Sequence, residues 1–368
     1  MDFKIKKTDF LNLLRWTQGI AEKRSTMQIL SNVLLEAADK CLKVTATDLE
    51  MALVTEGAIE GKGGLRLAVN SKHLYDIVRE APAEEIQLAK SDTLGVEVSS
   101  GKARFKIVGM NPDDYPQISQ VNSKTEILME ADGLSEMVEN TFYAVSTDET
   151  RYTLNGLYFT QGKAPGNLLR VVATDGHRLS YSERPVEKWK VDKGLLVPRK
   201  GIQELKKLLA EGSGELFFSH DEKTVRFRRG PVTLLVRLIE GEFPAYEQVI
   251  PQQLDRIASI ERDLLVGAMR RASILASTEG RGVRFGFSNN LLEVTSSHPD
   301  VGETSEEIPA DYKGSKFEVA FNPKYLLDVL SVLEDKKVVL ELKDDVSPCV
   351  IRSEFDRNFL ALVMPMRL

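Results

Sequence analysis

Cysteine and histidine are scarce in this sequence, so the side chains that most metal and catalytic sites require are thinly spread. The chain of 368 residues holds two cysteines and four histidines. It contains no CxxC pair, no HExxH pair and no GxxxxGK[ST] phosphate loop. We therefore expect no catalytic residue, no metal site and no cofactor. Because Cys41 and Cys349 lie far apart and nothing indicates export, we expect two reduced thiols.

Long hydrophobic runs are also missing. No stretch of about 18 uncharged apolar residues occurs, so we expect no transmembrane helix. The opening residues MDFKIKKTDF lack the apolar core of a signal peptide, and we expect a cytoplasmic protein. The 42% of hydrophobic residues suffice for real cores. The net charge of −6 argues, taken alone, against a protein that grips nucleic acid through many phosphate contacts.

An internal repeat organises the chain. Three segments align, beginning at residues 69, 197 and 321: VNSKHLYDIV, VPRKGIQELKKLL and FNPKYLLDVLSVL. In each segment a lysine is followed two positions later by an aliphatic residue, and two further on by an acid. A second set supports the first, because VTATD at 44–48 matches VVATD at 171–175, with VTSSH at 294–298 as a weaker third copy. The spacing between successive copies, with starts at residues 69, 197 and 321, fits a whole small domain and is too long for a solenoid unit.

The segments that end the first two copies are rich in proline and polar residues. They are NPDDYPQIS at 111–119 and GEFPAYEQVIPQQ at 241–253. We therefore predict three domains, at residues 1–122, 127–250 and 254–368.

Each copy is predicted to have an α+β fold. The lysine-led segments have the apolar spacing of helices, and a second helix is predicted near 8–23, 133–144 and 261–274. Strands are predicted at 41–47, 168–174, 225–228, 232–239 and 338–342. Two helices among several strands favour an arrangement in which both helices pack on one face of an antiparallel sheet.

Three motifs on these copies resemble one family. TDGHRL at 174–179, FPAYEQVIP at 243–251 and the final LVMPMRL at 362–368 are similar to the bacterial replicative DNA sliding clamp, the β subunit of DNA polymerase III holoenzyme. The resemblance covers the whole chain. It implies three DNA-clamp domains per chain and a ring-shaped head-to-tail homodimer, with helices lining a hole for duplex DNA. It also implies a non-catalytic processivity factor of DNA replication.

The resemblance further implies the partners. They are double-stranded DNA, the DNA polymerase III catalytic subunit, the clamp-loader ATPase, and other polymerases and repair proteins that carry a clamp-binding peptide. No membrane partner is expected. A closed ring holds DNA topologically and needs little phosphate affinity, which removes the objection raised by the net charge of −6.

The same resemblance implies a pocket for partner peptides between the second and third domains. The match assigns to it Leu154, Thr174, Gly176, His177, Arg178, Leu179, Pro244, Val249, Leu362, Val363, Met364, Pro365, Met366, Arg367 and Leu368, with Asn322 and Tyr325 at its edge. Methionine adapts to several peptides and suits such a surface. The match departs at Gln248, where the best-known family member carries arginine.

From the residues alone, other interpretations stay open. Asp175 and His177 could serve a hydrolase, or GHRL could be a plain turn in which Gly176 supplies the permissive backbone. The last strand could simply place Leu362 and Met364 in the core. A protein scaffold that never surrounds DNA is a further alternative, favoured by the acidic charge and opposed by the basic helix starts. Because the first copy has VTATD without GHRL, only GHRL is special to the second copy.

Two further surfaces are predicted. The DNA-contacting residues are Arg24, Arg151, Tyr152, Arg199 and Lys200, with solvated helix faces as the alternative. The segment KARFKIV is expected to form an edge strand of the ring joint, with Phe105 and Ile107 on one face and Lys102, Arg104 and Lys106 on the other. Its expected partners on the other subunit are Ile274, Leu275 and the acids of HPDVGETSEE, including Glu303 and Glu306. An acidic loop without a partner is the alternative there.

Overall fold

The computed structural model describes residues 2–21, 27–38, 40–91, 94–118, 121–123, 125–163, 166–276 and 282–367. Its contacts divide the chain into two compact units. The first unit combines residues 1–131 with 203–238, and the second combines 132–202 with 239–368. The second of the three predicted domains therefore contributes to both units, and the predicted domain boundaries stay a prediction.

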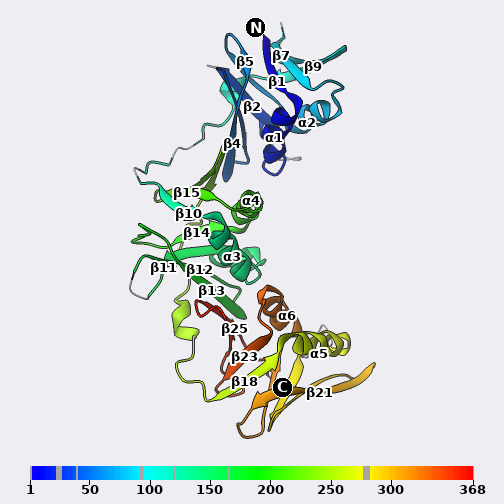
Figure 1. The fold of residues 1–368 in the computed structure, drawn as a ribbon, viewed down its shortest axis with the longest axis vertical. Helices are drawn as coiled ribbons and strands as arrows, with labels where there is room; N and C mark the ends of the chain where they lie inside the picture. The colour runs from blue at the N-terminus through cyan, green and yellow to red at the C-terminus, as the bar shows by residue number, and fades with distance from the viewer. Residues whose placement is uncertain are drawn as a thin grey trace. The chain divides into compact units, whose positions relative to one another are not determined.

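The first unit contains one antiparallel sheet. Its thirteen strands run in the order β10 (Ile127–Glu130), β15 (Glu215–His220), β16 (Thr224–Arg229), β17 (Val232–Arg237), β4 (Met51–Ala58), β3 (Cys41–Thr47), β2 (Asn32–Ala38), β6 (Leu65–Asn70), β9 (Ala103–Met110), β8 (Gly95–Ser100), β7 (Glu85–Lys90), β1 (Asp2–Lys6) and β5 (Glu60–Gly61). Helices α1 (Lys7–Thr17) and α2 (Ser71–Glu80) lie side by side in this unit (Figure 1). Helix α1 buries Phe10, Leu13 and Leu14, which share one face at helical spacing.

The second unit contains a twelve-stranded antiparallel sheet. Its order is β14 (Leu195–Pro198), β11 (Gly156–Gln161), β12 (Leu168–Thr174), β13 (Arg178–Pro185), β25 (Phe359–Val363), β24 (Cys349–Ser353), β23 (Lys337–Leu342), β18 (Arg256–Glu261), β21 (Gly302–Tyr312), β20 (Leu291–His298), β19 (Val283–Ser288) and β22 (Phe317–Phe321). Helices α5 (Arg262–Leu275) and α6 (Pro323–Val332) lie side by side here (Figure 1). The other α-helices of the described residues are α3 (Ala131–Phe142) and α4 (Arg199–Leu209), which begins in this unit and continues into the first. In the described ranges, no helix has the length and apolar character needed to cross a membrane.

The repeat seen in the sequence corresponds to repeated local structure. Each lysine-led segment forms a helix, namely α2, α4 and α6. The repeated lysines are exposed in all three, whereas the aliphatic residues that follow are buried: Leu74, Ile202 and Leu326. Thus the helical spacing correctly separated the solvent face from the core face.

One predicted boundary was wrong. The first helix was expected over residues 8–23 but ends at Thr17. A turn follows, and Gly19 lies in it. Glycine disfavours helix, and a Cβ at this position would come within 2.7 Å of the carboxylate of Glu204. The strands predicted at 41–47 and 168–174 are confirmed as β3 and β12.

Strand pairs join neighbouring copies with one repeated register. In the first unit, β17 pairs with β4 and places Val232 opposite Thr55. In the second unit, β25 pairs with β13 and places Phe359 opposite Ser182. A shift of 127 residues, from Thr55 to Ser182 and from Val232 to Phe359, maps the first pair onto the second.

Apart from the strands that end the two sheets, β9 and β21 each leave much of one edge unpaired in the described parts of the chain. Strand β9 pairs with β8 along its length, but with β6 only at Gly109 and Met110. Strand β21 pairs with β20 from Gly302 to Pro309, and with β18 only from Ala310 onward. Residues 103–108 and 302–309 therefore offer backbone groups to another strand.

Candidate functional site

The TDGHRL segment forms a tight, internally bonded turn between β12 and β13. Thr174 Oγ1 donates to the Arg178 carbonyl at 2.6 Å and accepts from the Gly176 amide at 3.1 Å. Asp175 Oδ1 accepts from the amides of His177 and Arg178 at 2.9 and 3.0 Å. Gly176 has a φ of +88°, in the left-handed region that favours glycine. The turn leaves the His177 side chain exposed and engages the Asp175 carboxylate in holding its own backbone.

Arg178 holds this turn against elements that are distant in sequence. Its guanidinium donates to Asp175 Oδ2 at 3.1 Å, to Asp328 Oδ2 at 2.6 Å and to the Tyr143 carbonyl at 2.7 Å. It also lies over the ring of Tyr325, 4.7 Å from the centroid. The side chain is only 8% exposed. Arg178 therefore links the turn to α6, and its expected contact with a partner peptide stays a prediction.

The end of the chain runs past the same turn. After β25, the Met364 amide donates to the His177 carbonyl at 2.9 Å, and the Met366 amide donates to the Ala320 carbonyl at 2.7 Å. Pro365, which has no N–H, lies between them. Arg367 is exposed, and Leu368 lies outside the described residues.

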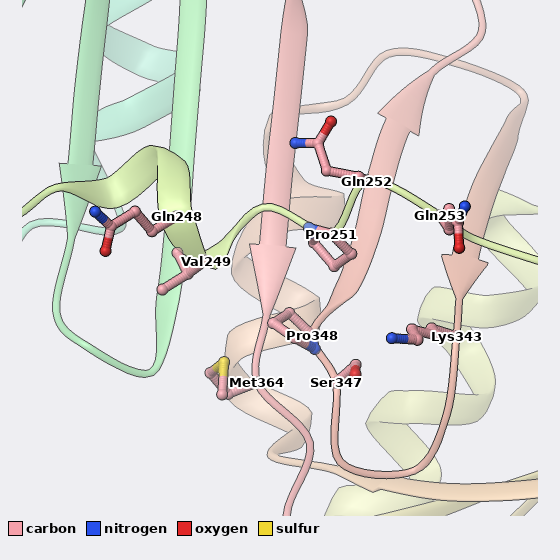
Figure 2. Close-up of a pocket in the computed structure, with 9 residues that line it drawn as sticks. All are labelled: Gln248, Val249, Pro251, Gln252, Gln253, Lys343, Ser347, Pro348 and Met364. Carbon is pink, nitrogen blue, oxygen red and sulfur yellow. The ribbon is translucent and has the colours of Figure 1, made fainter.

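A pocket of about 420 Å³ opens beside the Met364 side chain. It is lined by Gln248, Val249, Pro251, Gln252, Gln253, Lys343, Ser347, Pro348 and Met364. Figure 2 shows Val249 and Met364 at one end, Lys343 at the other, and Pro251 and Pro348 between them. Because the Met364 backbone also bonds to His177, the pocket and the turn share this residue.

The residues assigned to the pocket from sequence divide into support and surface. The buried ones are Leu154, Thr174, Arg178, Leu179, Leu362 and Val363. The exposed ones are Gly176, His177, Pro244, Val249 and Arg367, and the half-buried ones are Asn322, Tyr325, Met364, Pro365 and Met366. The His177 and Tyr325 rings stack at 6.0 Å, and Asn322 caps α6 by accepting from the Lys324 amide at 3.0 Å. The exposed residues of this set can therefore contact a ligand, whereas the buried residues hold them in place.

Sequence reasoning missed the far side of the pocket. Pro251 ends the FPAYEQVIP motif but is not assigned to the pocket from sequence, and Gln252 and Gln253 are interpreted only as part of the segment that ends the second copy. The loop with Lys343, Ser347 and Pro348 carried no recognisable motif. In this loop Asp344 accepts from the amides of Val346 and Ser347. A hydrogen bond from the Ser347 side chain, together with these two amide bonds, lowers the pKa of the Asp344 carboxyl. The loop leaves the Val346 side chain 65% exposed.

The predicted DNA-contacting residues differ in how far they are exposed to solvent. Arg151 and Tyr152 are exposed on the short helix η3 (Glu149–Leu154), where Arg151 donates to the Asp175 carbonyl at 3.1 Å. Arg199 is half-buried over the Phe142 ring at 4.9 Å. Lys200 is exposed, and Arg24 lies outside the described residues.

The predicted joint residues lie on the two open strand edges or beside them. In β9, Phe105 and Ile107 are half-buried while Arg104 and Lys106 are exposed. Lys102 lies in the turn before β9 and not on the strand, which corrects the sequence prediction.

On the acidic side, Glu306 pairs with Arg271 inside the chain through bonds of 2.6 and 2.8 Å, which lower the pKa of its carboxyl. Glu303 is exposed, as is Ile274 at the end of α5, and Leu275 is half-buried. Among the residues that the structure describes, no cluster of His, Cys, Asp and Glu is arranged to hold a metal.

Comparison with known proteins covers the chain from end to end. Three family models match it: the N-terminal, central and C-terminal domains of the DNA polymerase III beta subunit, at residues 1–119, 128–245 and 247–367. A Beta sliding clamp from Caulobacter vibrioides is 32% identical over 372 residues, covering 100% of both chains. The solved DNA polymerase III subunit beta from Pseudomonas aeruginosa is 32% identical, with a TM-score of 0.95 and 100% of both chains covered. A sliding clamp from Bartonella birtlesii bound to griselimycin is 31% identical, with a TM-score of 0.94 and the same coverage.

Tyr246 is buried between Pro244 and Val249, and we expect its phenol to make the stability of the protein depend on alkaline pH. Burial raises the pKa of its phenol. A tyrosine with a higher pKa in the folded chain holds its proton more tightly there. Its contribution to stability is therefore complete below about pH 10 and is lost as the pH rises through the folded pKa.

We expect the free energy of unfolding to fall less steeply above about pH 10 in the Tyr246→Phe variant than in the natural protein. The measurement is urea unfolding at a series of pH values between about 8 and 11. Equal slopes would show that this phenol has the same pKa in the folded and unfolded chains.

Proposed function

The chain belongs to the family of DNA polymerase III beta subunits, and we propose on this basis that it is a non-enzymatic sliding clamp of DNA replication. It encircles duplex DNA as a head-to-tail homodimeric ring and tethers the replicative polymerase. The observation that carries this proposal is the pair of open strand edges, because the repeat implies how they join two copies of the chain.

The two strand junctions within the chain indicate the register of a third junction, the one that we propose between two copies of the chain. Strand β9 corresponds to β17 and β25, and β21 corresponds to β4 and β13. The 127-residue shift relates Val232 to Phe105. The hairpin pair Thr174–Leu179 corresponds to Ser297–Glu303, so that Ser182 corresponds to Glu306. We therefore expect β9 of one copy to pair with β21 of another, with Phe105 opposite Glu306.

In this register, the side chains of the joint form two faces, one mainly apolar and one charged. Glu306 faces α5, since it pairs with Arg271 of that helix. Phe105 and Ile107 would therefore face α5 of the partner copy, where Ile274 is 78% exposed. Burial of these apolar side chains stabilises the joint.

The opposite face of the joint is charged. The same register places Arg104 opposite Glu307 and Lys106 diagonally between Glu303 and Glu307. Opposite charges on facing strands contribute roughly 0.2–1 kcal/mol per pair and exclude the wrong pairing of two like edges. The β9 edge is basic and the β21 edge is acidic, so a contact between them is head-to-tail, and such contacts close into a ring when the rotation permits.

DNA is held by enclosure more than by affinity. Arg151, Tyr152 and Lys200 are exposed and supply contacts to the sugar-phosphate backbone, together with Arg24. Arg199 packs on Phe142 and contributes more weakly. A net charge of −6 is compatible with this mode, because a ring that slides must not bind phosphates tightly.

The pocket at Val249 and Met364, with the adjoining His177 turn, receives the peptide segments of partners. These are the polymerase III catalytic subunit, the clamp loader, and other polymerases and repair proteins with a clamp-binding peptide. Griselimycin, bound to the similar clamp from Bartonella birtlesii, supplies a probe.

The hydrolase alternative is weaker, because both Asp175 carboxylate oxygens are bonded within the turn and to Arg178. We place this function in the cytoplasm.

Topological binding is tested by cutting the DNA. The protein is loaded on nicked circular DNA by a clamp loader, separated from free protein, and the circle is then linearised. We expect the protein to remain on circles and to leave linear DNA, as measured by gel filtration. Retention on linear DNA at moderate salt would indicate phosphate-driven binding and contradict enclosure.

The proposed joint is tested by exchanging its charges. A variant with Arg104→Glu and Lys106→Glu has two acidic edges, and a variant with Glu303→Lys and Glu307→Lys has two basic edges. We expect each alone to be monomeric in sedimentation velocity at low salt, because like charges then oppose each other. An equimolar mixture should form dimers again. Monomers in the mixture, or dimers of either variant alone, would contradict this register.

The His177 side chain is expected to contact the bound peptide. His177→Ala should weaken griselimycin binding about tenfold in calorimetry, the scale of a well-packed interface residue. Dimer formation in sedimentation velocity should not change, because His177 is not part of the proposed joint. His73→Ala, which removes another exposed histidine, is the matched control and should bind like the natural protein. Equal affinities for both variants would remove His177 from the pocket.

A further inference from the structure

We infer that Arg170 is a positioning residue of the peptide pocket: its buried guanidinium holds the linker that carries Pro244 and Val249, and thereby sets the affinity for the bound segment. This inference rests on the proposed peptide-binding function. Arg170 was not among the residues that the sequence indicated.

The linker needs an external anchor. Val249 ends the single-turn helix η4 (Tyr246–Val249), and Ala245 before it offers no side-chain cap. Short helices of this kind have poor hydrogen-bond geometry and little stability of their own. Val249 is nevertheless exposed and lines the pocket, and Pro244, before the helix, is exposed as well. Their placement therefore depends on the residues between them.

Tyr246 and Glu247, which lie between Pro244 and Val249, are held by the Arg170 side chain. Arg170 Nη1 donates to the Tyr246 hydroxyl at 3.1 Å and to Glu247 Oε1 at 3.4 Å. The Tyr246 ring is buried and meets Phe243 edge-on at 6.1 Å. Phe243 in turn stacks on Tyr158 of β11 at 4.6 Å. One guanidinium nitrogen thus bonds two successive residues of η4.

Arg170 is itself fixed by its neighbours on the sheet. Its Nε donates to Glu183 Oε1 at 2.7 Å, and Glu183 is the residue opposite it in the β12–β13 pair. The guanidinium lies 4.5 Å from the centroid of the Tyr181 ring. The side chain is 8% exposed. A planar group that stacks and donates in several directions fits this site, whereas a lysine ammonium cannot do both.

The same two strands position the other wall of the pocket. Arg170 and Thr174 lie on β12, separated by four residues, so their side chains point to the same face of the strand. Thr174 braces the turn that presents His177. The β12–β13 hairpin therefore sets both the turn and the linker, and with them the width of the site.

The test separates positioning from general stability. Removing Arg170 alone would leave Glu183 buried without its partner, which destabilises a fold strongly. We therefore combine Arg170→Gln with Glu183→Gln, and use Tyr246→Phe as a milder variant that removes one hydroxyl and keeps the ring. The control combines Arg226→Gln with Glu126→Gln, which removes the ion pairs of 2.8 and 2.9 Å that Glu126 makes with Arg226 and Arg228 in the first unit.

Three quantities are measured on the full-length protein: griselimycin affinity, thermal midpoint and amide hydrogen exchange. We expect about tenfold weaker binding for the double variant and about threefold for Tyr246→Phe. Exchange should rise at the amides of Gln248 and Ile250, which bond within η4, and stay unchanged at Met364. The control should keep both its affinity and its exchange in the linker.

Several outcomes would overturn the inference. Unchanged affinity in Tyr246→Phe and the double variant would do so, as would faster exchange spread evenly over the second unit. If the double variant does not fold, Tyr246→Phe decides by the same measurements. Failure of the natural protein to bind griselimycin would instead remove the peptide-binding function itself, and the inference with it.

Discussion

Backbone pairing between the edge strands of successive copies is the constraint on which this structure depends. An exposed strand edge carries unpaired N–H and C=O groups, which must find partners in water or in another strand. Within the chain, β17 with β4 and β25 with β13 meet this requirement in one repeated register. In the described residues, β9 and β21 keep most of one edge unpaired after these junctions have formed. The capacity for assembly is therefore a consequence of how the copies join.

The proposed peptide site depends on the second of these junctions. Because β13 pairs with β25, the turn after β12 lies beside the end of the chain, and the Met364 amide reaches the His177 carbonyl. Two buried arginines complete the arrangement from opposite ends of the β12–β13 hairpin. Arg178 bonds toward α6, and Arg170 bonds toward η4. Both guanidinium groups are paired with carboxylates, without which their burial would be costly.

Charge placement matters more here than total charge. The chain is acidic overall, with 55 acidic and 49 basic side chains. The open edge of β9 nevertheless exposes Arg104 and Lys106, while that of β21 exposes Glu303 and Glu307. Charges placed on edges determine which partner is accepted and contribute modestly to affinity. Composition alone therefore says little about whether such a protein surrounds DNA.

The sequence by itself determined the elements and their repetition. Apolar spacing depends on local geometry, so α2, α4 and α6 and strands such as β3 and β12 could be predicted, with errors at ends such as Thr17. The tertiary structure decided what those elements bring together. It turned Arg178 inward, gave Arg170 its role, and placed the loop at Lys343 beside the linker. Contacts between residues separated by tens to hundreds of positions leave no periodic signal, because they are set by which strands pair and not by local preference.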